Sequence, residues 1–404
     1  MNIHKVSDET LVDLMFHLKW KSDSAQHTDV YNAAQVNIWR DYLPAAVSDA
    51  IKNRQTGERV DIQLKPVDLL PAGDQRNLFD IKRRQFGNPF TKNSVTRPEE
   101  GRFYPKGLLK DVTHVFAANR QPFRCVQLNN GHMTVDFNHP LAGKDFSLST
   151  LIGNIAPKRV ERGGTSVDWL AVLTDGPGMQ ARWRDEPSSF FSHDAFTRED
   201  SEPDTRFYRD PRFVQHIDDT AIEVVKANYG RFLQDGMQVL DLMSSWQSHL
   251  PEGLKLGRLA GLGLNEKELR RNPSLSEWVV QDLNQSVTLP FENGSFDAVV
   301  NTVSIEYLVD PLAMFKQVRR VLRPGGYFLV SFSNRWFENK AVKIWKEIHE
   351  FERMGLVLEL FLRTEGFKNL QTYSMRGLPR PHSDKYYPDL PYSDPMYIVW
   401  GQKS

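Results

Sequence analysis

The stretch Met237-Gln-Val-Leu-Asp-Leu-Met-Ser-Ser-Trp246 decides the fold of this chain. Its apolar residues around Leu240 predict a short buried strand, and Asp241 places one carboxylate near the strand's end. Ser244 and Ser245 follow where the chain must turn. A parallel strand that delivers an acid and a tight turn to its carboxyl edge builds a ligand crevice there. We therefore expect a ligand pocket beside Asp241, made without the glycines that usually form such a turn.

Strands and helices alternate through the second half of the chain, which indicates a parallel sheet. Apolar spacing predicts helices over 218–232 and 311–322, and a longer helical segment over 340–363 with a break near Gly355. The expected strands are 239–242, 259–264, 278–281, 296–301 and 327–331, with 370–373 and 396–400 as a closing antiparallel pair.

Further motifs follow the first one in a fixed order. Gln281-Asp-Leu-Asn284 ends a strand with an acid, and Leu289-Pro-Phe-Glu-Asn-Gly-Ser-Phe-Asp-Ala-Val-Val300 and Val321-Leu-Arg-Pro-Gly-Gly-Tyr-Phe-Leu-Val330 come after it. This set resembles the class I S-adenosylmethionine-dependent methyltransferases, in particular their type 11 group. The resemblance implies an α/β Rossmann-like domain over 208–404 with a mostly parallel seven-stranded sheet. It also implies S-adenosyl-L-methionine as cofactor and methyl transfer to an unidentified small-molecule, peptide or protein acceptor.

The resemblance implies cofactor contacts at two strand ends. Asp241 matches the acid near the methionine amino group, and a buried carboxylate needs such a partner. Asp282 matches the acid that accepts a hydrogen bond from the adenine amino group, and Leu283 follows where a backbone N–H meets the ring. The alternative for each aspartate is a local role in capping backbone N–H groups.

The second strand departs from the family pattern. Gly263 stands where an acid usually binds both ribose hydroxyls, so Asn265 or Glu266 would have to reach the ribose instead. Asn265 is equally suited to cap the helix that begins at Glu266.

The turn after the first strand departs as well. Ser244 and Ser245 still offer backbone N–H groups to a cofactor, although left-handed torsions at serine cost energy. Trp246 stands where small residues are usual, and its indole either turns away or fills part of the pocket.

The end of the fourth strand supplies more candidates. In the resembled family the backbone at the positions of Asn301 and Val303 contacts the cofactor. Glu306 and Tyr307 come next, at the mouth for the acceptor, and are candidates for orienting the nucleophile or for plain surface positions. We identify no general base.

The segment before the first helix resembles a lid over the cofactor. Its candidates are Tyr208, Phe213 and His216, and the alternative is ordinary packing of a linker.

The N-terminal half carries a different motif. Val135-Asp-Phe-Asn-His-Pro-Leu-Ala-Gly-Lys144 resembles the SlyD-like branch of FKBP-type peptidyl-prolyl isomerases, which implies an α+β, FKBP-like β domain over 1–155 with one helix at 45–51. We expect an inserted segment near 86–105 and a connecting segment over 156–207. Ala46 stands where an aromatic residue usually floors the prolyl pocket. The resemblance therefore implies a docking domain for substrate or partner, with active isomerase as an alternative.

Composition limits the remaining function classes. Lys+Arg and Asp+Glu both number 51, which gives no electrostatic footprint for nucleic acid or an anionic membrane. Cys125 is the single cysteine, which excludes an intrachain disulfide or a cysteine zinc site, and no metal spacing stands out. The N-terminus lacks the apolar core of a signal peptide, so we expect a cytoplasmic protein. Nothing specifies an oligomeric state. A methyltransferase fold without turnover, serving as a binding or chaperone-like module, is the other alternative.

Overall fold

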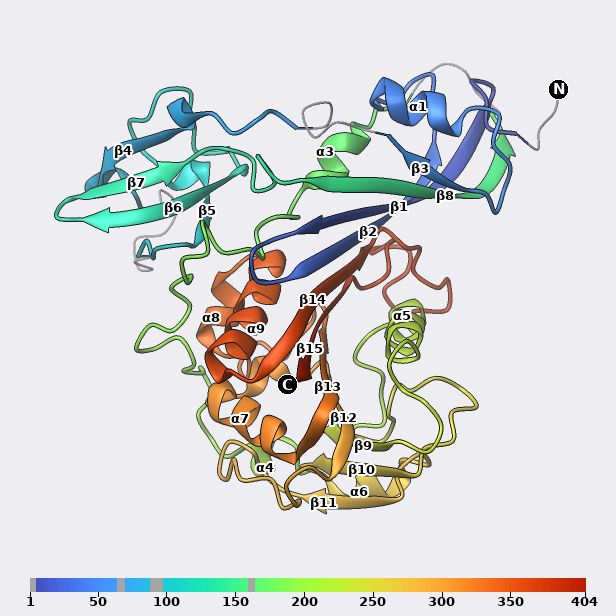
Figure 1. Cartoon of the computed structure of the whole chain (residues 1–404), viewed down its shortest axis with the longest axis vertical. Coiled ribbons are helices and arrows are strands. Elements are labelled where there is room, and N and C mark those ends of the chain that lie inside the picture. Colours follow the sequence, from blue (N-terminus) through green and yellow to red (C-terminus); the bar gives the residue numbers. More distant parts are fainter. Residues whose placement is uncertain (1–4, 64–69, 88–96, 159–163) are drawn as a thin grey trace. The chain divides into compact units, whose positions relative to one another are not determined.

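A computed structural model describes residues 5–63, 70–87, 97–158 and 164–404 (Figure 1). The chain forms two compact units. The N-terminal unit comprises 1–24, 35–192 and 348–356, and the C-terminal unit comprises 25–34, 193–347 and 357–404. The segment 156–207, expected to connect two domains, contains helices α3 (Trp169–Thr174) and α4 (Asp204–Phe207), and the boundary between the units falls after Ser192.

The C-terminal unit contains the predicted parallel strands, but the sheet to which they belong is mixed and has eleven strands, not the expected seven. Part of its strand order is β11-β10-β9-β12-β13-β15-β14. The first five pair in parallel, and β15 pairs antiparallel with both β13 and β14, as expected for a closing pair. The bounds are β9 (Gln238–Leu242), β10 (Arg258–Gly263), β11 (Glu277–Val280), β12 (Phe296–Thr302), β13 (Leu322–Phe332), β14 (Phe367–Arg376) and β15 (Met396–Lys403).

One further pairing was not predicted. Residues 26–31 of β2 (Gln26–Val36) pair in parallel with β14. A strand from the far end of the sequence gives no local signal of the edge on which it will pair.

The topology determines where a ligand can bind. From β9 the chain moves outward through β10 to β11 and then returns to the other side of β9 as β12. The strand order therefore reverses between β9 and β12. In open parallel sheets, ligands bind outside the carboxyl ends of the strands at such a reversal. Strand β9 is buried along both faces, so Asp241 is a charged residue set within an apolar strand.

The helices follow from capping and apolar spacing. Helix α5 (Asp219–Tyr229) begins after Asp218, whose side chain accepts from the N–H of Ala221, and helix α7 (Pro311–Val321) begins in the same way after Asp310. Figure 1 shows α5 and α7 on opposite faces of the sheet. Helix α6 (Glu266–Arg271) follows β10.

The segment predicted to be helical over 340–363 is two helices. These are α8 (Lys343–Glu347) and α9 (Glu350–Thr364). The break lies between Glu347 and Glu350 and not at Gly355, which lies inside α9. A side chain at Gly355 would approach the backbone oxygen of Gln180 to 3.2 Å, so this glycine serves close packing.

The N-terminal unit is mainly antiparallel. Strands β1 (Thr10–Lys21) and β3 (Arg59–Ile62) both pair with β8 (Phe146–Pro157). Helix α1 (Ala45–Ile51) has the predicted bounds and buries Val47 and Ile51. No helix in the described part of the chain combines the length and apolar character needed to cross a membrane.

A second sheet in the same unit has the order β4-β7-β6-β5. Its strands are β4 (Leu78–Lys82), β5 (Phe103–Pro105), β6 (Pro122–Asn129) and β7 (His132–Asp136). Strands β6 and β7 pair antiparallel and form a hairpin around Asn129-Asn-Gly131. The segment expected as an insertion, 86–105, lies partly outside the described residues (88–96) and otherwise includes β5. The separate sheet is thus larger than the insertion expected over 86–105.

Candidate active site

A cavity of about 460 Å³ lies at the carboxyl ends of β9, β10, β11 and β12. Residues that end or follow each of these strands line it, together with the 204–216 segment. The lining residues include Asp204, Phe207, Tyr208, Arg212, His216, Asp241, Met243, Ser244, Ser245, Ser248, His249, Gly263, Asn265, Glu268, Asp282, Leu283, Val303, Tyr307, Arg335, Phe337, Lys385 and Tyr386. The topology and the first motif therefore point to the same place.

Trp246 does not line this cavity. Its indole N–H donates to the backbone oxygen of Val214 at 3.2 Å, and its ring packs edge-on against Phe213 at 6.3 Å between centroids. Of the two orientations left open by the sequence, the indole takes the one that turns away from the pocket. The same contact explains Phe213, which is partly exposed and lies outside the cavity, contrary to its expected place over the cofactor.

The turn after β9 places its strain at a residue that was not predicted. Met243 has a φ of 62°, so neither serine adopts the left-handed torsion expected of this turn. Glycine is required instead on the neighbouring strand. A Cβ at Gly263 would lie 2.2 Å from the backbone oxygen of Ser244, so this glycine lets β10 approach the turn closely. The backbone N–H of Ser244 donates to Leu262 O at 2.7 Å and holds that approach.

Asp241 is buried beneath the turn. Its Oδ2 accepts hydrogen bonds from Ser244 Oγ at 2.6 Å and from Ser248 Oγ at 2.5 Å. Burial raises the pKa of Asp241 to about 6, and the two serine hydroxyls only partly oppose that rise. No cation pairs with Asp241 among the described residues. A cationic ligand group would therefore relieve the cost of ionising this carboxylate.

Asp282 presents a second acceptor. Its Oδ1 accepts the backbone N–H of Asn284 at 2.9 Å, which is the capping role weighed from the sequence. Its Oδ2 is buried and has no hydrogen-bond partner among the described residues. Such an atom is costly unless a ligand donates to it. Leu283 is buried next to it and gives the same wall an apolar surface.

The side chains that follow β10 make contacts other than the ribose contact considered from the sequence. Asn265 lines the cavity, but its Oδ1 caps α6 by accepting from the N–H groups of Lys267 and Glu268, which confirms the capping alternative. Its Nδ2 donates to Tyr208 O at 2.8 Å. Glu266 pairs with Arg270 at 2.7 Å and is not among the residues that line the cavity.

Glu268 is the acid that the sequence reasoning missed. Its Oε1 accepts the backbone N–H of Arg212 at 2.7 Å, and its Oε2 accepts Ser245 Oγ at 2.6 Å. Its spacing from Asn265, one helical turn onward, was the available signal. Ser248 and His249 were also missed, because no local pattern marks a loop that folds back beneath a carboxylate.

Two predicted residues at the end of β12 lie outside the cavity. Asn301 is fully buried, and its Nδ2 donates to Leu242 O at 3.1 Å and to Ser304 Oγ at 3.0 Å, which ties β12 to β9. Glu306 is 1% exposed and does not line the cavity, so it is not positioned to orient a nucleophile there. Val303 does line it, with a φ of 43°.

Tyr307 and the lid residues do face the cavity. The Tyr307 hydroxyl accepts the N–H of Phe337 at 2.9 Å, and burial raises the pKa of Tyr307 well above its ordinary value. It therefore remains protonated at neutral pH. Tyr208 and His216 line the cavity, and burial also raises the pKa of Tyr208 and lowers that of His216.

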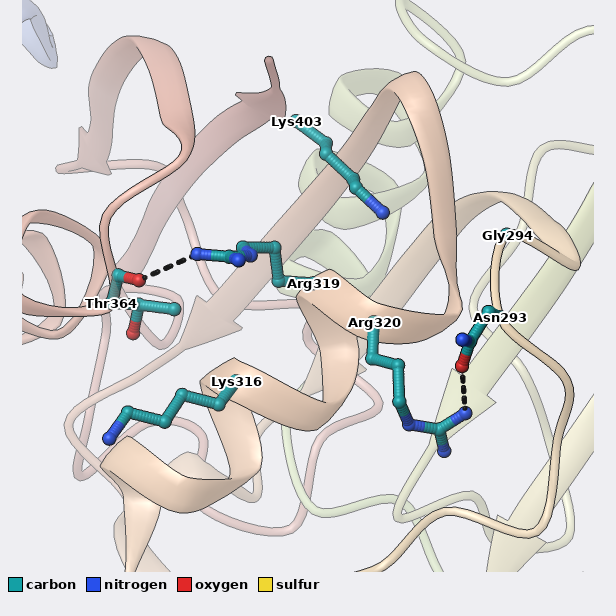
Figure 2. Close-up of a pocket in the computed structure, with 7 residues that line it drawn as sticks. All are labelled: Asn293, Gly294, Lys316, Arg319, Arg320, Thr364 and Lys403. Atoms are coloured by element: carbon teal, nitrogen blue, oxygen red, sulfur yellow. Dashed lines mark hydrogen bonds between the residues drawn. The ribbon is translucent and has the colours of Figure 1, made fainter.

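A larger cavity of about 690 Å³ lies at the other ends of the strands. Asn293 and Gly294 precede β12, and Lys403 donates to the oxygen of Leu322, the first residue of β13. Figure 2 shows Arg319 directed at Thr364 and Arg320 at Asn293. These arginines bind local oxygen atoms, and none of the described residues that line this cavity carries a carboxylate, so they offer no negative charge to a cationic group. Its lining residues are Asn293, Gly294, Lys316, Arg319, Arg320, Thr364 and Lys403.

The similarities to known proteins include the part of the chain that forms the 460 Å³ cavity. Residues 254–330 match the family model described as a methyltransferase domain. The chain is 37% identical over 70 residues to malonyl-[acyl-carrier protein] O-methyltransferase of Hahella chejuensis, covering 17% of this chain and 24% of that protein. It is 32% identical over 100 residues to demethylmenaquinone methyltransferase of Lactococcus lactis, covering 22% and 40%.

The matches are partial in length. The chain spans less than half the length of the curated relatives it matches. Among solved structures, a SAM-dependent methyltransferase of Aquifex aeolicus aligns at 17% identity with a TM-score of 0.32, covering 51% of this chain and all of that one. Within the second half of the chain, residues 254–330 are therefore similar to a methyltransferase domain.

Proposed function

We propose that this protein transfers the methyl group of S-adenosylmethionine to an acceptor bound in the 460 Å³ cavity. The observation that carries the proposal is the pair of acids in that cavity. Asp241 is buried without a cation, and Asp282 Oδ2 is buried without a donor. The cofactor carries an ammonium group, which would pair with Asp241, and an adenine amino group, which would donate to Asp282 Oδ2.

The residues present fit the cofactor. Asp241 would hold the methionine ammonium, and Asp282 would accept from the adenine amino group while Leu283 packs against the ring. When bound, S-adenosylmethionine supplies an electrophilic methyl carbon on a sulfonium. The protein contributes position and exclusion of water, which are the main requirements of an in-line displacement.

The residues around the acceptor side do not supply an evident base. Tyr307 stays protonated and has its hydroxyl oxygen engaged by Phe337 N–H. Glu306 lies outside the cavity. We therefore propose that the acceptor reaches the site already able to attack, so that proton removal is not the role of these residues.

The role of the N-terminal unit belongs to the same proposal. We propose that it is an FKBP-like domain that presents a peptide or protein acceptor, on the strength of the Asn138-His-Pro-Leu-Ala-Gly143 resemblance. A proline-peptide isomerisation assay on the full chain tests the isomerase alternative. A rate equal to the uncatalysed rate would leave docking as the role to test.

Calorimetric titration of S-adenosylhomocysteine into the full chain tests the cofactor proposal. We expect one site, weakened about tenfold or more in Asp282→Ala, because a hydrogen bond to a charged group is worth about 1.5–3 kcal/mol. Asp219→Asn is the control, since Asp219 is an exposed residue in the first turn of α5. Absence of binding to the unaltered chain would defeat the proposal and favour a binding module without turnover.

A further inference from the structure

Acids and cations reach the cavity from different parts of the fold. The acids Asp241, Glu268 and Asp282 come from the strand ends and from α6. A further acid, Asp204, comes from the lid segment, but it is already paired with Arg198 at 2.8 Å and with Lys340 at 3.1 Å. The cations Arg212, Arg335 and Lys385 all come from segments outside the sheet. The positive side of the cavity is therefore open to a carboxylate, which belongs either to the cofactor or to a second ligand.

Arg212 is the central residue of that positive side. Its guanidinium lies over the rings of Phe207 and Phe337, with its Cζ 4.3 Å and 4.8 Å from their centroids, and 5.5 Å from that of Tyr208. One nitrogen donates to Phe207 O at 3.3 Å. No carboxylate lies within ion-pair distance of Arg212 in the described part of the chain. The rings hold the guanidinium flat and fixed while its charge stays without a carboxylate partner.

Two other cations share this side. Arg335 pairs with Asp394 at 3.3 Å, but Asp394 is also bound by Arg380 at 2.6 Å, so its charge is divided between two arginines. Lys385 is exposed and lies 4.8 Å from the centroid of Tyr386, with no ion-pair partner among the described residues.

The pKa of His216 depends on the charges that surround it in the cavity. Burial lowers its pKa most, Glu268 acts in the opposite direction, and the positive charges of Arg212, Arg335 and Lys385 lower it further. The three cations therefore act on the same region, and the imidazole there is neutral at pH 7.

We infer that the methyl acceptor is an organic acid whose carboxylate binds Arg212, with Lys385 and Arg335 adding longer-range attraction. This inference rests on the proposed function, because it assigns the remaining part of the cofactor cavity. A guanidinium matches a carboxylate through two parallel hydrogen bonds. The rings of Phe207, Tyr208 and Phe337 favour an apolar or aromatic body next to the acid group.

The experiment compares probes that differ only in charge. The full chain is saturated with S-adenosylhomocysteine and titrated with phenylacetate or phenylacetamide, and with hexanoate or hexanamide. We expect each carboxylate to bind at least about tenfold more tightly than its amide in the unaltered chain. Arg212→Gln should remove most of that preference, Arg212→Lys should keep part of it, and S-adenosylhomocysteine affinity should stay within about threefold.

The control is Arg231→Gln. Arg231 also lies over two rings, those of Phe232 and Trp400, but it does not line the cavity, so its loss should leave the preference unchanged. If Arg212→Gln fails to fold, Lys385→Gln serves instead, with a smaller expected loss of about two- to threefold.

The outcomes separate this inference from the proposed function. Equal binding of acid and amide, or no acid binding at millimolar concentration, would overturn the inference while cofactor binding stands. Loss of S-adenosylhomocysteine affinity in Arg212→Gln would also overturn it, because Arg212 would then hold the carboxylate of the cofactor. Failure of the unaltered chain to bind S-adenosylhomocysteine would instead defeat the proposed function.

Discussion

Replacing Asp241 by Asn should stabilise the free protein and weaken cofactor binding. The carboxylate is 5% exposed, and burial raises its pKa to about 6 from an ordinary value of 3.8. A difference of about two pKa units means that ionising Asp241 costs the folded state roughly 3 kcal/mol. The Asn side chain can still accept from Ser244 and Ser248, but its buried amide hydrogens cost about 1 kcal/mol. We expect a net gain of about 2 kcal/mol above pH 7.

The pH dependence gives the sign of this effect. Because the folded pKa of Asp241 lies above the unfolded one, the native state binds the proton more tightly, and stability falls as pH rises from about 4 through 6. That fall should be absent in Asp241→Asn, so the variant should be slightly less stable than the unaltered chain near pH 4, where the amide cost of about 1 kcal/mol dominates, and should have its full advantage at about pH 8.

Urea unfolding and calorimetry measure the two halves of this prediction. Unfolding of both proteins across this pH range gives the stability difference, and titration with S-adenosylhomocysteine at about pH 8 should show at least a tenfold loss of affinity in the variant. A variant that is less stable than the unaltered chain at that pH, or that binds with unchanged affinity, would refute the argument that Asp241 is held for a cationic ligand group.

Three further substitutions test the geometry of the site. Gly263→Ala should lose about 1–3 kcal/mol in urea unfolding, because its Cβ would lie 2.2 Å from Ser244 O, and an unchanged midpoint would contradict the close approach. Asn265→Ala should lose about 1 kcal/mol as a helix cap and should speed hydrogen exchange at Tyr208 and its neighbours; unchanged exchange there would separate the lid from this residue. Trp246→Ala should leave S-adenosylhomocysteine affinity within about threefold, and a tenfold loss would place the indole at the cofactor.

The fold of the C-terminal unit was largely predictable from the sequence. Continuous apolar runs such as 239–242 and 296–301 indicate buried strands of a parallel sheet when helices alternate with them. The structure confirms these strands. The same reasoning found Asp241, Asp282 and Tyr307, because each lies at or just after the carboxyl end of a strand. A strand end is fixed by local sequence, so its position at the sheet edge follows from topology.

The direction of individual side chains was not predictable in the same way. Asn301 and Glu306 lie in or near the expected strand end, yet their side chains lie outside the cavity. For Asn301, a residue of β12, successive positions face opposite sides and an uncertainty of one position reverses the conclusion, whereas Glu306 lies in the short 3-10 helix Ile305–Tyr307 that follows the strand. Glu268 was missed because it lies on α6 and contacts Ser245 in the turn after β9, and Arg212 was missed because its stacked rings come from segments far apart in the sequence.

A crystal structure of the full chain with S-adenosylhomocysteine tests the central claim most directly. We expect the ammonium group beside Asp241, the adenine amino group at Asp282 Oδ2, and the Trp246 indole still hydrogen-bonded to Val214 O. A ligand bound elsewhere, or an indole ring swung into the space between the two acids, would contradict the claim.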